Sequence, residues 1–489
     1  MNPEGQAPSA APTRLEQRAV AGMLLYFLAR ALFLALEIAP GIPPDEATHL
    51  GRVLAYARVG WLPSDGPATY ALGALQHGPP LYYLLLAKVL LLKPAGMEAL
   101  VFLRCANLLL AALCAYCAYR CAGELSRNPW ARLLALLLVT NTLMFTGLAA
   151  SVNYDNLVNL LGALAITALL AFRRAGAPSA LALALAALLA GALTKVAFLP
   201  LVVLGLGMAC FAGRAQIRML PSRMRVWLRA RPLRAGLAGL GVAGLLAGNI
   251  VLYGGNLLRF GALEPRADQV LGLENALQNR IFARNWIFRQ YQEGRLDFAQ
   301  ARERAVGIQH IGDRRHTLWL LEREQQRQRG LDPQQRIAPF GYALAWGDLM
   351  LRRTLGYTGH QRAMKSDAQL LPYVAFLGLA LGVYAFRALR GRGPWLDWAG
   401  GLGVAYALVL LCFVNYPAYQ RFGEIDVGVQ GRYLFPVMAP LWSLAACHLA
   451  HALPRRWRAP LLAGVALWFV WGDLPWLLLN APATWFSGA

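Results

Sequence analysis

The chain has 489 residues, of which 57% are hydrophobic and only 15% are charged, whereas about a quarter of the residues in a soluble domain are charged. In a soluble protein, the net charge of +22 would point to nucleic acid. Here the arginines cluster between long apolar runs, which is the pattern of membrane topology. We therefore expect a protein embedded among membrane lipids and exclude nucleic acid as a partner.

Apolar runs of about 20 residues, the length that crosses a bilayer core of about 30 Å, recur along the chain. They predict an all-α integral membrane protein with about eleven transmembrane helices. The expected spans are 19–38, 100–122, 130–149, 156–173, 178–194, 196–212, 235–255, 370–388, 396–414, 433–450 and 459–479. The apolar run 81–92 is shorter and follows two prolines, so we expect a helix in or against the membrane interface.

Arginine clusters between these runs set the expected orientation, because basic loops face the cytoplasm. The strongest cluster is the run 213–234, which carries seven arginines. With eleven spans, every cluster and the N-terminus fall on one side, whereas a crossing at 81–92 would put basic loops on both sides. The abundance of alanine, leucine and arginine is typical of a GC-rich bacterium. The expected location is therefore the bacterial inner membrane, with the outer loops in the periplasm.

This topology divides the chain into three parts. A transmembrane core covers residues 1–255 and includes a first outer loop at 39–99, which carries juxtamembrane helices. A polar outer segment follows at 256–369, and C-terminal transmembrane helices occupy 370–489. The outer segment has helical patches and lacks the alternation of strands, so we expect a small helical cap.

The first group of candidate functional residues opens the first outer loop with the run Pro-Pro-Asp-Glu at 43–46. Asp45, His49 and Arg52 are spaced four and three residues apart, so a helix would place them on one face. A carboxylate, an imidazole and a guanidinium together suit proton abstraction beside a bound anion. They could also hold a divalent metal ion, although so few ligands on one helix make a weak metal motif. The same run is also an ordinary helix start, with Asp45 near the N-cap.

Two further groups are expected on the same side of the membrane. Tyr154 and Asp155 belong to the polar run 151–156 between two spans, where polar groups are costly unless they line a cavity or meet water. Asp155 could equally be the N-cap of the next span. Lys195 is one of four lysines in the chain and lies between two apolar runs. Its ammonium could reach a phosphate or could extend to the interface.

The last group is the run Gln-Gly-Arg-Tyr at 430–433, where an outer loop enters a span. Arg432 would lie at the outer headgroups, against the positive-inside bias, and Arg421 belongs to the same loop. A guanidinium is well matched to a phosphate or pyrophosphate. Because all these groups are expected on one side of the membrane, they fit a lipid phosphate whose headgroup is transferred there.

These motifs resemble the GT-C superfamily of membrane glycosyltransferases, which use polyprenyl-linked sugars. In that superfamily, the first span is followed by a long outer loop with juxtamembrane helices and an essential acidic residue. The run His-Gly-Pro-Pro-Leu-Tyr-Tyr at 77–83 is similar to its juxtamembrane segment. The chain also resembles a bacterial group with Pro-Pro-Asp-Glu followed by His, then Tyr-Asp, then Gln-Gly-Arg-Tyr. The runs 43–49, 154–155 and 430–433 match these motifs in order.

The resemblance implies a transferase with a polyprenyl-phosphate-linked sugar as donor and a glycan or lipid as acceptor. Asp45 would be the general base, with Glu46 as its support or as a second catalytic candidate. The residues that would bind substrate and the carrier phosphate are His49, Arg52, His77, Tyr154, Asp155, Lys195, Arg421, Gln430, Arg432 and Tyr433. The outer segment lacks a recognisable soluble domain such as oligosaccharyltransferases carry, so transfer onto a protein is less expected.

Two other functions stay open at this point. The same cations could guide the headgroup of a lipid-linked sugar through a transporter or flippase, although no internal repeat typical of transporters is visible. A ligase could instead move a whole glycan from a pyrophosphate carrier. A divalent metal ion is the one cofactor that the sequence leaves open.

Overall fold

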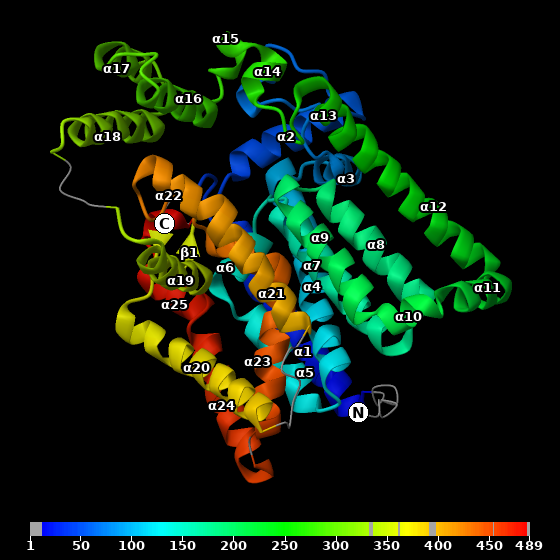
Figure 1. Ribbon diagram of the computed structural model, residues 1–489. Helices are drawn as coiled ribbons and strands as arrows, with labels where there is room; N and C mark the ends of the chain where they lie inside the picture. Colours follow the sequence, from blue (N-terminus) through cyan, green and yellow to red (C-terminus); the bar gives the residue numbers. More distant parts are fainter. Residues whose placement is uncertain (1–11, 332–335, 360–361, 391–397, 453, 487–489) are drawn as a thin grey trace.

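The computed structural model describes residues 12–331, 336–359, 362–390, 398–452 and 454–486. Figure 1 shows a bundle of helices with a smaller group of helices above one end, and the N-terminus at the other end. Among the described residues, the only strands are the short antiparallel pair β1 (Tyr357–Thr358) and β2 (Arg362–Ala363). The all-α fold expected from the sequence is confirmed.

Eight helices of the described chain are long and apolar enough to cross a membrane, and each overlaps an expected span. They are α1 (Arg14–Glu37), α4 (Ala99–Leu125), α7 (Asp155–Ala175), α12–α13 (Pro232–Phe260), α20 (Asp367–Leu389), α21–α22 (Trp398–Phe422), η5–α23 (Gly431–Ala452) and α24–α25 (Arg456–Asn480). The first residues of the expected span 396–414 lie outside the described residues. This is the architecture of a multi-pass membrane protein.

The other three expected spans are not among these eight helices, because one is a bent pair and two are shorter. The span at 130–149 is a pair, α5 (Pro129–Thr140) and α6 (Leu143–Ala149), bent by 66°. The spans at 178–194 and 196–212 are the shorter helices α8 (Pro178–Ala192) and α9 (Leu199–Ala212). The run 81–92 forms the ten-residue helix α3 (Leu81–Leu90), which is too short to span a bilayer.

The bend between α5 and α6 has a cause in the sequence. Thr140, Asn141 and Thr142 are consecutive, and each side chain donates a hydrogen bond to a backbone carbonyl one turn earlier, at 2.8, 2.9 and 2.7 Å. Such bonds compete with the helix ladder and bend helices. Three in a row end α5, and α6 then continues in a new direction.

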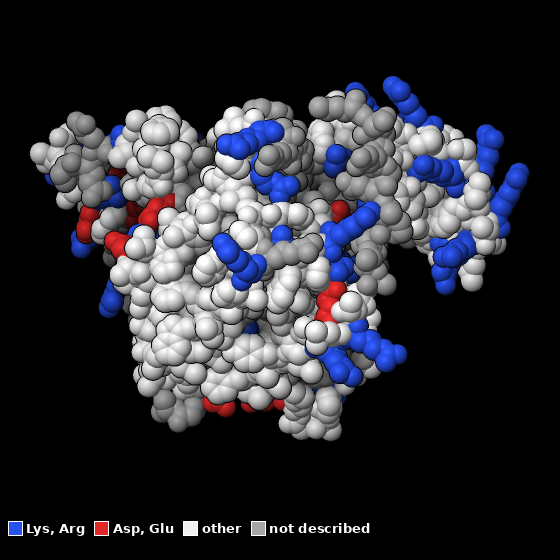
Figure 2. Space-filling view, turned by 90° about the horizontal axis from the view of Figure 1, so that it is seen from below, with Lys and Arg blue, Asp and Glu red and all other residues white. Residues whose placement is uncertain are grey.

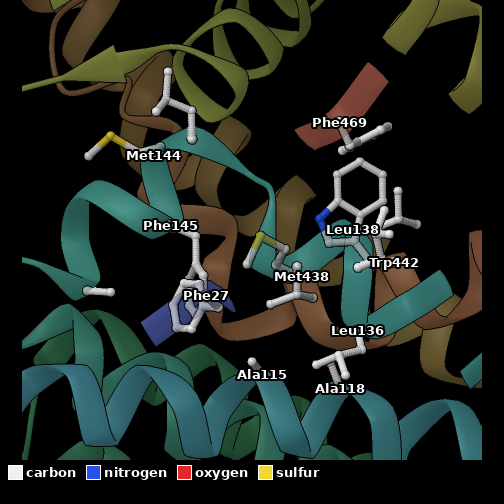
Figure 3. Packing of buried hydrophobic residues seen from close by; sticks show 14 of the residues in the cluster. Phe27, Ala115, Ala118, Leu136, Leu138, Met144, Phe145, Met438, Trp442 and Phe469 are labelled. Atoms are coloured by element: carbon white, nitrogen blue, oxygen red, sulfur yellow. The ribbon is translucent and has the colours of Figure 1, made fainter. Parts of the chain in front are cut away.

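The core of the bundle packs around α4. Its buried alanines Ala111, Ala115, Ala118 and Ala122 are three or four residues apart and form a stripe of small side chains. Small residues let neighbouring helices approach closely within a membrane. Figure 3 shows larger side chains filling the space beyond this stripe, with Phe27 stacked on Phe145 at a ring distance of 5.7 Å.

Basic side chains are prominent on the lower face of the molecule (Figure 2). The arginine-rich run between α9 and α12 forms α10 (Arg214–Arg218) and α11 (Leu220–Ala230), at the end away from the upper helices (Figure 1). Figure 2 looks at the molecule from below and shows many lysine and arginine side chains, fewer acidic ones, and a broad uncharged surface at the lower left. Which end of the bundle faces the cytoplasm stays a prediction from the arginine clusters.

The upper helices come from the polar segment between α13 and α20. They are α14 (Ala267–Leu271), α15 (Leu273–Ala276), α16 (Arg280–Gln292), α17 (Phe298–Val306) and α18 (Ile311–Gln328), whereas α19 (Pro339–Leu355) lies lower, at the level of the bundle (Figure 1). We call α16, α17 and α18 the cap. The cap has a hydrophobic core of its own, in which Ile287, Phe288, Ala301 and Leu321 are buried. The helix α2 (Glu46–Val59) lies at the top of the bundle, below α14 and α15 and to the right of the cap in Figure 1.

A buried ion pair joins the beginning of the outer loop to the bundle. Arg104 of α4 binds both carboxylate oxygens of Glu46, at 2.9 and 2.6 Å, and both side chains are 2% exposed. The same guanidinium donates to the carbonyls of Ala35 and Ile38 at the end of α1. Glu46 also accepts a hydrogen bond of 3.0 Å from the backbone N–H of Val152. One pair therefore fixes three segments.

We predict that replacing Arg104 with alanine will destabilise the protein strongly, because Glu46 then stays buried without its counter-charge. Breaking a buried ion pair from one side costs about 3–5 kcal/mol. The measurement is thermal unfolding of the purified protein in detergent. Asp348→Ala, which removes the exposed partner of Arg352, is the control and should cost roughly 0–1 kcal/mol. Equal melting temperatures for the two variants would contradict the importance of the pair.

Candidate functional site

Asp45 is held in an unusual backbone conformation at the entrance to α2. Its φ of 57° and ψ of 10° make it the single non-glycine residue with positive φ in the described chain. Such residues cluster at functional sites, where the surrounding structure holds the strain. Here Glu46 is fixed by Arg104 on one side, and Asn153 donates a hydrogen bond of 3.0 Å to the carbonyl of Pro44 on the other. Asp45 occupies the N-cap position, but its carboxylate makes no capping hydrogen bond.

The carboxylate of Asp45 begins a chain of alternating charges. Its Oδ2 lies 2.8 Å from Nη2 of Arg432. Nε of Arg432 lies 3.5 Å from Oδ2 of Asp155, whose Oδ1 accepts a hydrogen bond of 2.7 Å from Nζ of Lys195. Asp45 is the most exposed of the four, with 37% of its side chain accessible, whereas Arg432 and Asp155 are buried. The structure therefore brings together four of the residues selected from the sequence.

Aromatic rings enclose the inner end of this chain. Nζ of Lys195 lies over the rings of Tyr154 and Tyr433, at 4.5 and 4.7 Å from their centroids. A ring face attracts a cation, and the attraction grows when water is excluded. Burial by itself would lower the pKa of Lys195, but Asp155 and the two tyrosines outweigh it, so the pKa lies above its ordinary value. Lys195 is thus held as a positive charge.

His49 and Arg52 follow Asp45 along α2 and meet at one tyrosine. Nδ1 of His49 lies 2.9 Å from the hydroxyl of Tyr83, and Nη1 of Arg52 donates to the same hydroxyl at 3.4 Å. Arg52 also donates two hydrogen bonds to the carbonyl of Leu72. Burial lowers the pKa of His49 to about 3. The imidazole is therefore neutral near pH 7 and serves there as a hydrogen-bonding group.

The remaining expected residues occupy other positions. His77 and Asn256 hydrogen-bond to each other twice, at 2.9 Å each, which ties the first outer loop to α13 (Gly255–Phe260). Glu46 lies behind the site with both oxygens engaged. Gln430 precedes η5 (Gly431–Val437), and its carbonyl accepts from the N–H of Tyr433. Arg421 belongs to α22 (Tyr416–Phe422), and its carbonyl accepts a hydrogen bond from Gln292 of the cap.

A cavity of about 1330 Å³ lies between α2, the loops beside it and the cap. Its lower wall includes Arg52, Tyr154 and Lys195, and its upper wall includes Arg289 and Arg421. Pockets for small ligands usually measure about 300–1,000 Å³, so this one has room for more than a single sugar. Thr48 and Arg52 of α2 line the cavity. Asp45 lies three residues before Thr48, so it is on the same face of the helix.

Several residues that shape the site were not selected from the sequence. Arg104 is one, and its signal was a charge at the start of an apolar span, where an ionisable residue needs a partner. Tyr83 lies in the run 77–83 but was not itself proposed. Glu264 and Arg289 carry no local signal, because they reach the cavity only through the packing of the outer segment.

The described residues offer no obvious metal centre. Among them, no group of three or more histidine, cysteine, aspartate or glutamate side chains is arranged to hold a metal ion. Asp45 and Asp155 approach each other through Arg432, whose guanidinium lies between their carboxylates. A requirement for a divalent metal ion stays an open expectation.

No protein-family model matches the chain. No curated protein matches it either. Two similar solved structures are the archaeal oligosaccharyltransferase AglB from Archaeoglobus fulgidus, in complex with an inhibitory peptide and a dolichol-phosphate, and ArnT from Cupriavidus metallidurans in the apo state.

The likeness to both structures is distant. The AglB match has 12% identity and a TM-score of 0.43, and covers 94% of this chain and 55% of AglB. This chain thus spans about half the length of AglB. The ArnT match has 15% identity and a TM-score of 0.36, and covers 88% of this chain and 78% of ArnT. Similarity at this level carries no activity to this chain, and the functional content of the GT-C resemblance stays a prediction.

The low pKa of His49 predicts a pH dependence of stability. The unfolded chain takes up a proton on this residue below pH 6.5, whereas the folded protein does so only near pH 3. Stability should therefore fall as the pH drops from about 6.5, by up to roughly 1.4 kcal/mol per pH unit. His49→Gln should reduce this loss between pH 7 and pH 5, measured by thermal unfolding. Because both proteins share the other titrating groups, identical pH dependence would show that His49 is not buried as a neutral group.

Proposed function

We propose that this protein is a glycosyltransferase that moves a sugar from a polyprenyl-phosphate carrier to a glycan or lipid acceptor. In this proposal the site lies on the periplasmic face of a bacterial inner membrane. The observation that carries the proposal is the alternating chain from Asp45 to Lys195. It places an accessible carboxylate beside Arg432 and links it through Asp155 to Lys195, which lines a large cavity at one end of an apolar bundle.

The reaction that fits this arrangement is a single displacement at the anomeric carbon of the donor. The acceptor hydroxyl oxygen forms a bond to that carbon while Asp45 takes the hydroxyl proton. The bond between the anomeric carbon and the phosphate oxygen breaks, and its electron pair leaves with the polyprenyl phosphate. The leaving group is an anion, so cations stabilise it better than an acid does.

In this proposal, the base Asp45 and the cation Arg432 work together. Arg432 is bound to Asp45 before the reaction, so part of its charge is already balanced. When Asp45 takes up the proton it loses its charge, and Arg432 becomes available to the phosphate as negative charge develops there. Nη1 of Arg432 is buried and has no hydrogen-bond partner among the described residues, which leaves a donor for this purpose.

Other residues of the site then take supporting roles. Glu46 is a positioning residue in this proposal, because Arg104 and Val152 engage its carboxylate and it holds Asp45 in place. His49 is neutral and orients Tyr83. Lys195 supplies a fixed positive charge for the carrier phosphate, and Arg52 adds a second one at the cavity wall.

The first prediction of this proposal concerns Asp45. In a deletion strain, Asp45→Asn should fail to restore a sugar-sized mass on surface glycans or glycolipids that the wild-type protein restores, as measured by mass spectrometry. A positioned base contributes about 10²–10⁴-fold in rate, so the loss should be nearly complete. Asp348→Asn, a surface change with the same chemistry, is the control.

Other outcomes of this experiment contradict the proposal in different ways. Full restoration by Asp45→Asn would remove the general base, and a transporter of lipid-linked sugars would explain the mass better. Loss of a whole glycan, instead of one sugar, would indicate a ligase that uses a pyrophosphate carrier.

The second prediction separates binding from turnover. Lys195→Gln should weaken donor binding, because a hydrogen bond to a charged group contributes about 1.5–3 kcal/mol, or roughly 10- to 150-fold. Asp45→Asn should instead lower kcat and leave donor affinity nearly unchanged. The measurement is kinetics of the purified protein with varied donor, with Lys195→Arg as the charge-retaining control. A change in kcat alone for Lys195→Gln would argue against phosphate binding by this residue.

A further inference from the structure

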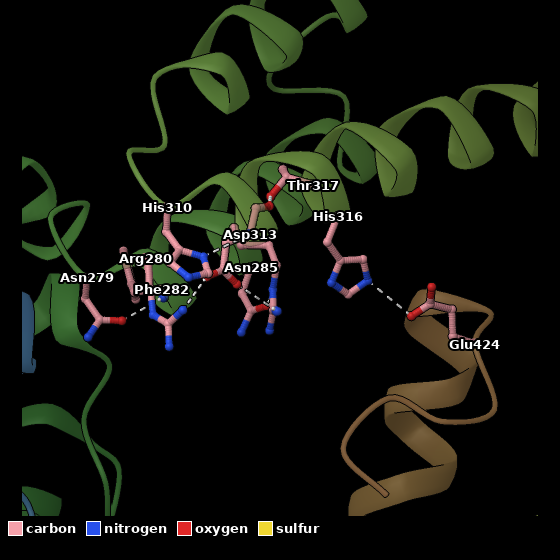
Figure 4. Close-up of polar contacts among 10 residues, drawn as sticks. Asn279, Arg280, Phe282, Asn285, His310, Asp313, His316, Thr317 and Glu424 are labelled. Atoms are coloured by element: carbon pink, nitrogen blue, oxygen red, sulfur yellow. Dashed lines mark hydrogen bonds and ion pairs between the residues drawn. The ribbon is translucent and has the colours of Figure 1, made fainter. Parts of the chain in front are cut away.

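The upper wall of the cavity is basic. Arg266, Arg280, Arg289 and Arg421 line it from the outer segment and α22. Two of them already have carboxylate partners, since Arg266 pairs with Asp268 at 3.0 Å and Arg280 pairs with Asp313 at 2.9 Å. Figure 4 shows Arg280 directed toward Asp313 within the cap, where His310 also contacts that carboxylate.

Arg289 and Arg421 differ from these two. Within the part of the chain that the structure describes, neither has a carboxylate at ion-pair distance. Nε of Arg289 is buried and lacks a hydrogen-bond partner among the same residues. A buried donor without a partner is costly unless a ligand satisfies it. Burial and the neighbouring Arg266 and Arg421 lower the pKa of Arg289.

Both arginines are placed by rigid packing. The ring of Phe288, next to Arg289 on α16, stacks on Phe422 of α22 with centroids 5.2 Å apart. Gln292 of α16 donates a hydrogen bond of 2.9 Å to the carbonyl of Arg421. The seam between the cap and α22 therefore fixes the backbones of two cations on one wall of the cavity.

The charges of the cavity point to an anionic ligand. Six lysine or arginine residues line it, against two acidic residues, Glu264 and Glu274. Lys195 at the lower wall is already balanced by Asp155. Among the described residues, the cations that line the cavity and have no carboxylate at ion-pair distance are Arg52, Arg289 and Arg421. Positive charge that is not balanced locally concentrates anionic ligands in a cavity.

We propose that Arg289 and Arg421 form a second anion site, which binds a phosphate or carboxylate group of the acceptor glycan. This inference rests on the proposed function and specifies its acceptor. The carrier phosphate is attached to a lipid and stays near the ends of the spans, beside Lys195 and Arg432. An acceptor that enters from the water reaches the cap wall first, with its hydroxyl directed toward Asp45.

The test is binding of three probes to the purified full-length protein in lipid nanodiscs, by calorimetry. Glucose 6-phosphate represents an anionic sugar, glucose its neutral counterpart, and farnesyl phosphate the carrier headgroup. We expect glucose 6-phosphate to bind more tightly than glucose. The variant Arg289→Gln/Arg421→Gln should weaken glucose 6-phosphate binding at least about tenfold and leave farnesyl phosphate binding unchanged.

Matched variants make the result specific. Arg302→Gln changes an exposed arginine of the cap that does not line the cavity, and should bind all probes as the wild type does. Arg289→Lys/Arg421→Lys keeps both charges and should retain most of the affinity. Arg421→Gln alone alters an exposed side chain, so it should fold normally and still weaken glucose 6-phosphate binding severalfold.

Two results would overturn the inference. One is equal binding of glucose 6-phosphate by the wild type and by folded Arg421→Gln. The other is a parallel loss of farnesyl phosphate binding in the double glutamine variant, which would assign both arginines to the carrier. Failure of farnesyl phosphate to bind the wild-type protein would contradict the proposed function itself, so the two failures are distinguishable.

Discussion

The burial of charge at the end of an apolar bundle is the constraint on which this structure depends. Arg104 enters the bundle from α4 and is balanced by Glu46, whose backbone leads directly into Asp45. The same guanidinium binds the last carbonyls of α1, and Glu46 binds the N–H of Val152. Since an unbalanced charge in this position is very costly, the pair holds the end of α1, the start of α2 and the loop before α7 in one arrangement. The strained backbone of Asp45 is a product of that arrangement.

The charged groups of the site fall into two parts, a charge-balanced set that includes Asp45 and a basic wall of the cavity. Asp45, Arg432, Asp155 and Lys195 alternate in sign and balance one another as a set. Such a set has little net charge, so it attracts distant anions weakly. When one carboxylate is protonated, the set gains a net positive charge. The upper wall of the cavity differs, because Arg289 and Arg421 have no carboxylate at ion-pair distance among the described residues, and charges of this kind act at longer range. In the function proposed here, the upper wall collects the substrate and the balanced set carries out the transfer.

The sequence predicted the positions of the spans because each apolar run is long enough to be recognised without knowledge of its neighbours. It also selected Asp45, Asp155, Lys195 and Arg432, since polar residues beside a membrane are rare. The sequence alone could not predict which of these residues pair, because Arg432 and Asp45 are 387 residues apart. The bend between α5 and α6 was missed for a different reason. The bend depends on which backbone carbonyls accept hydrogen bonds from three polar side chains, whereas the apolar run alone predicts a straight helix. Arg289 carried no signal, because its position at the cavity results from the packing of the cap on α22.

The hydrophobic core of the cap has a consequence for the proposed acceptor. Because Ala301, Leu321 and their neighbours form a hydrophobic core separate from those of the bundle, we expect substitutions on the surface of the cap to leave the helices that hold Asp45 in place. In the function proposed here, changes in the cap would remodel one wall of the cavity while Asp45 and its partners stay in place. Proteins with the same bundle and different caps would then share a donor and differ in their acceptors.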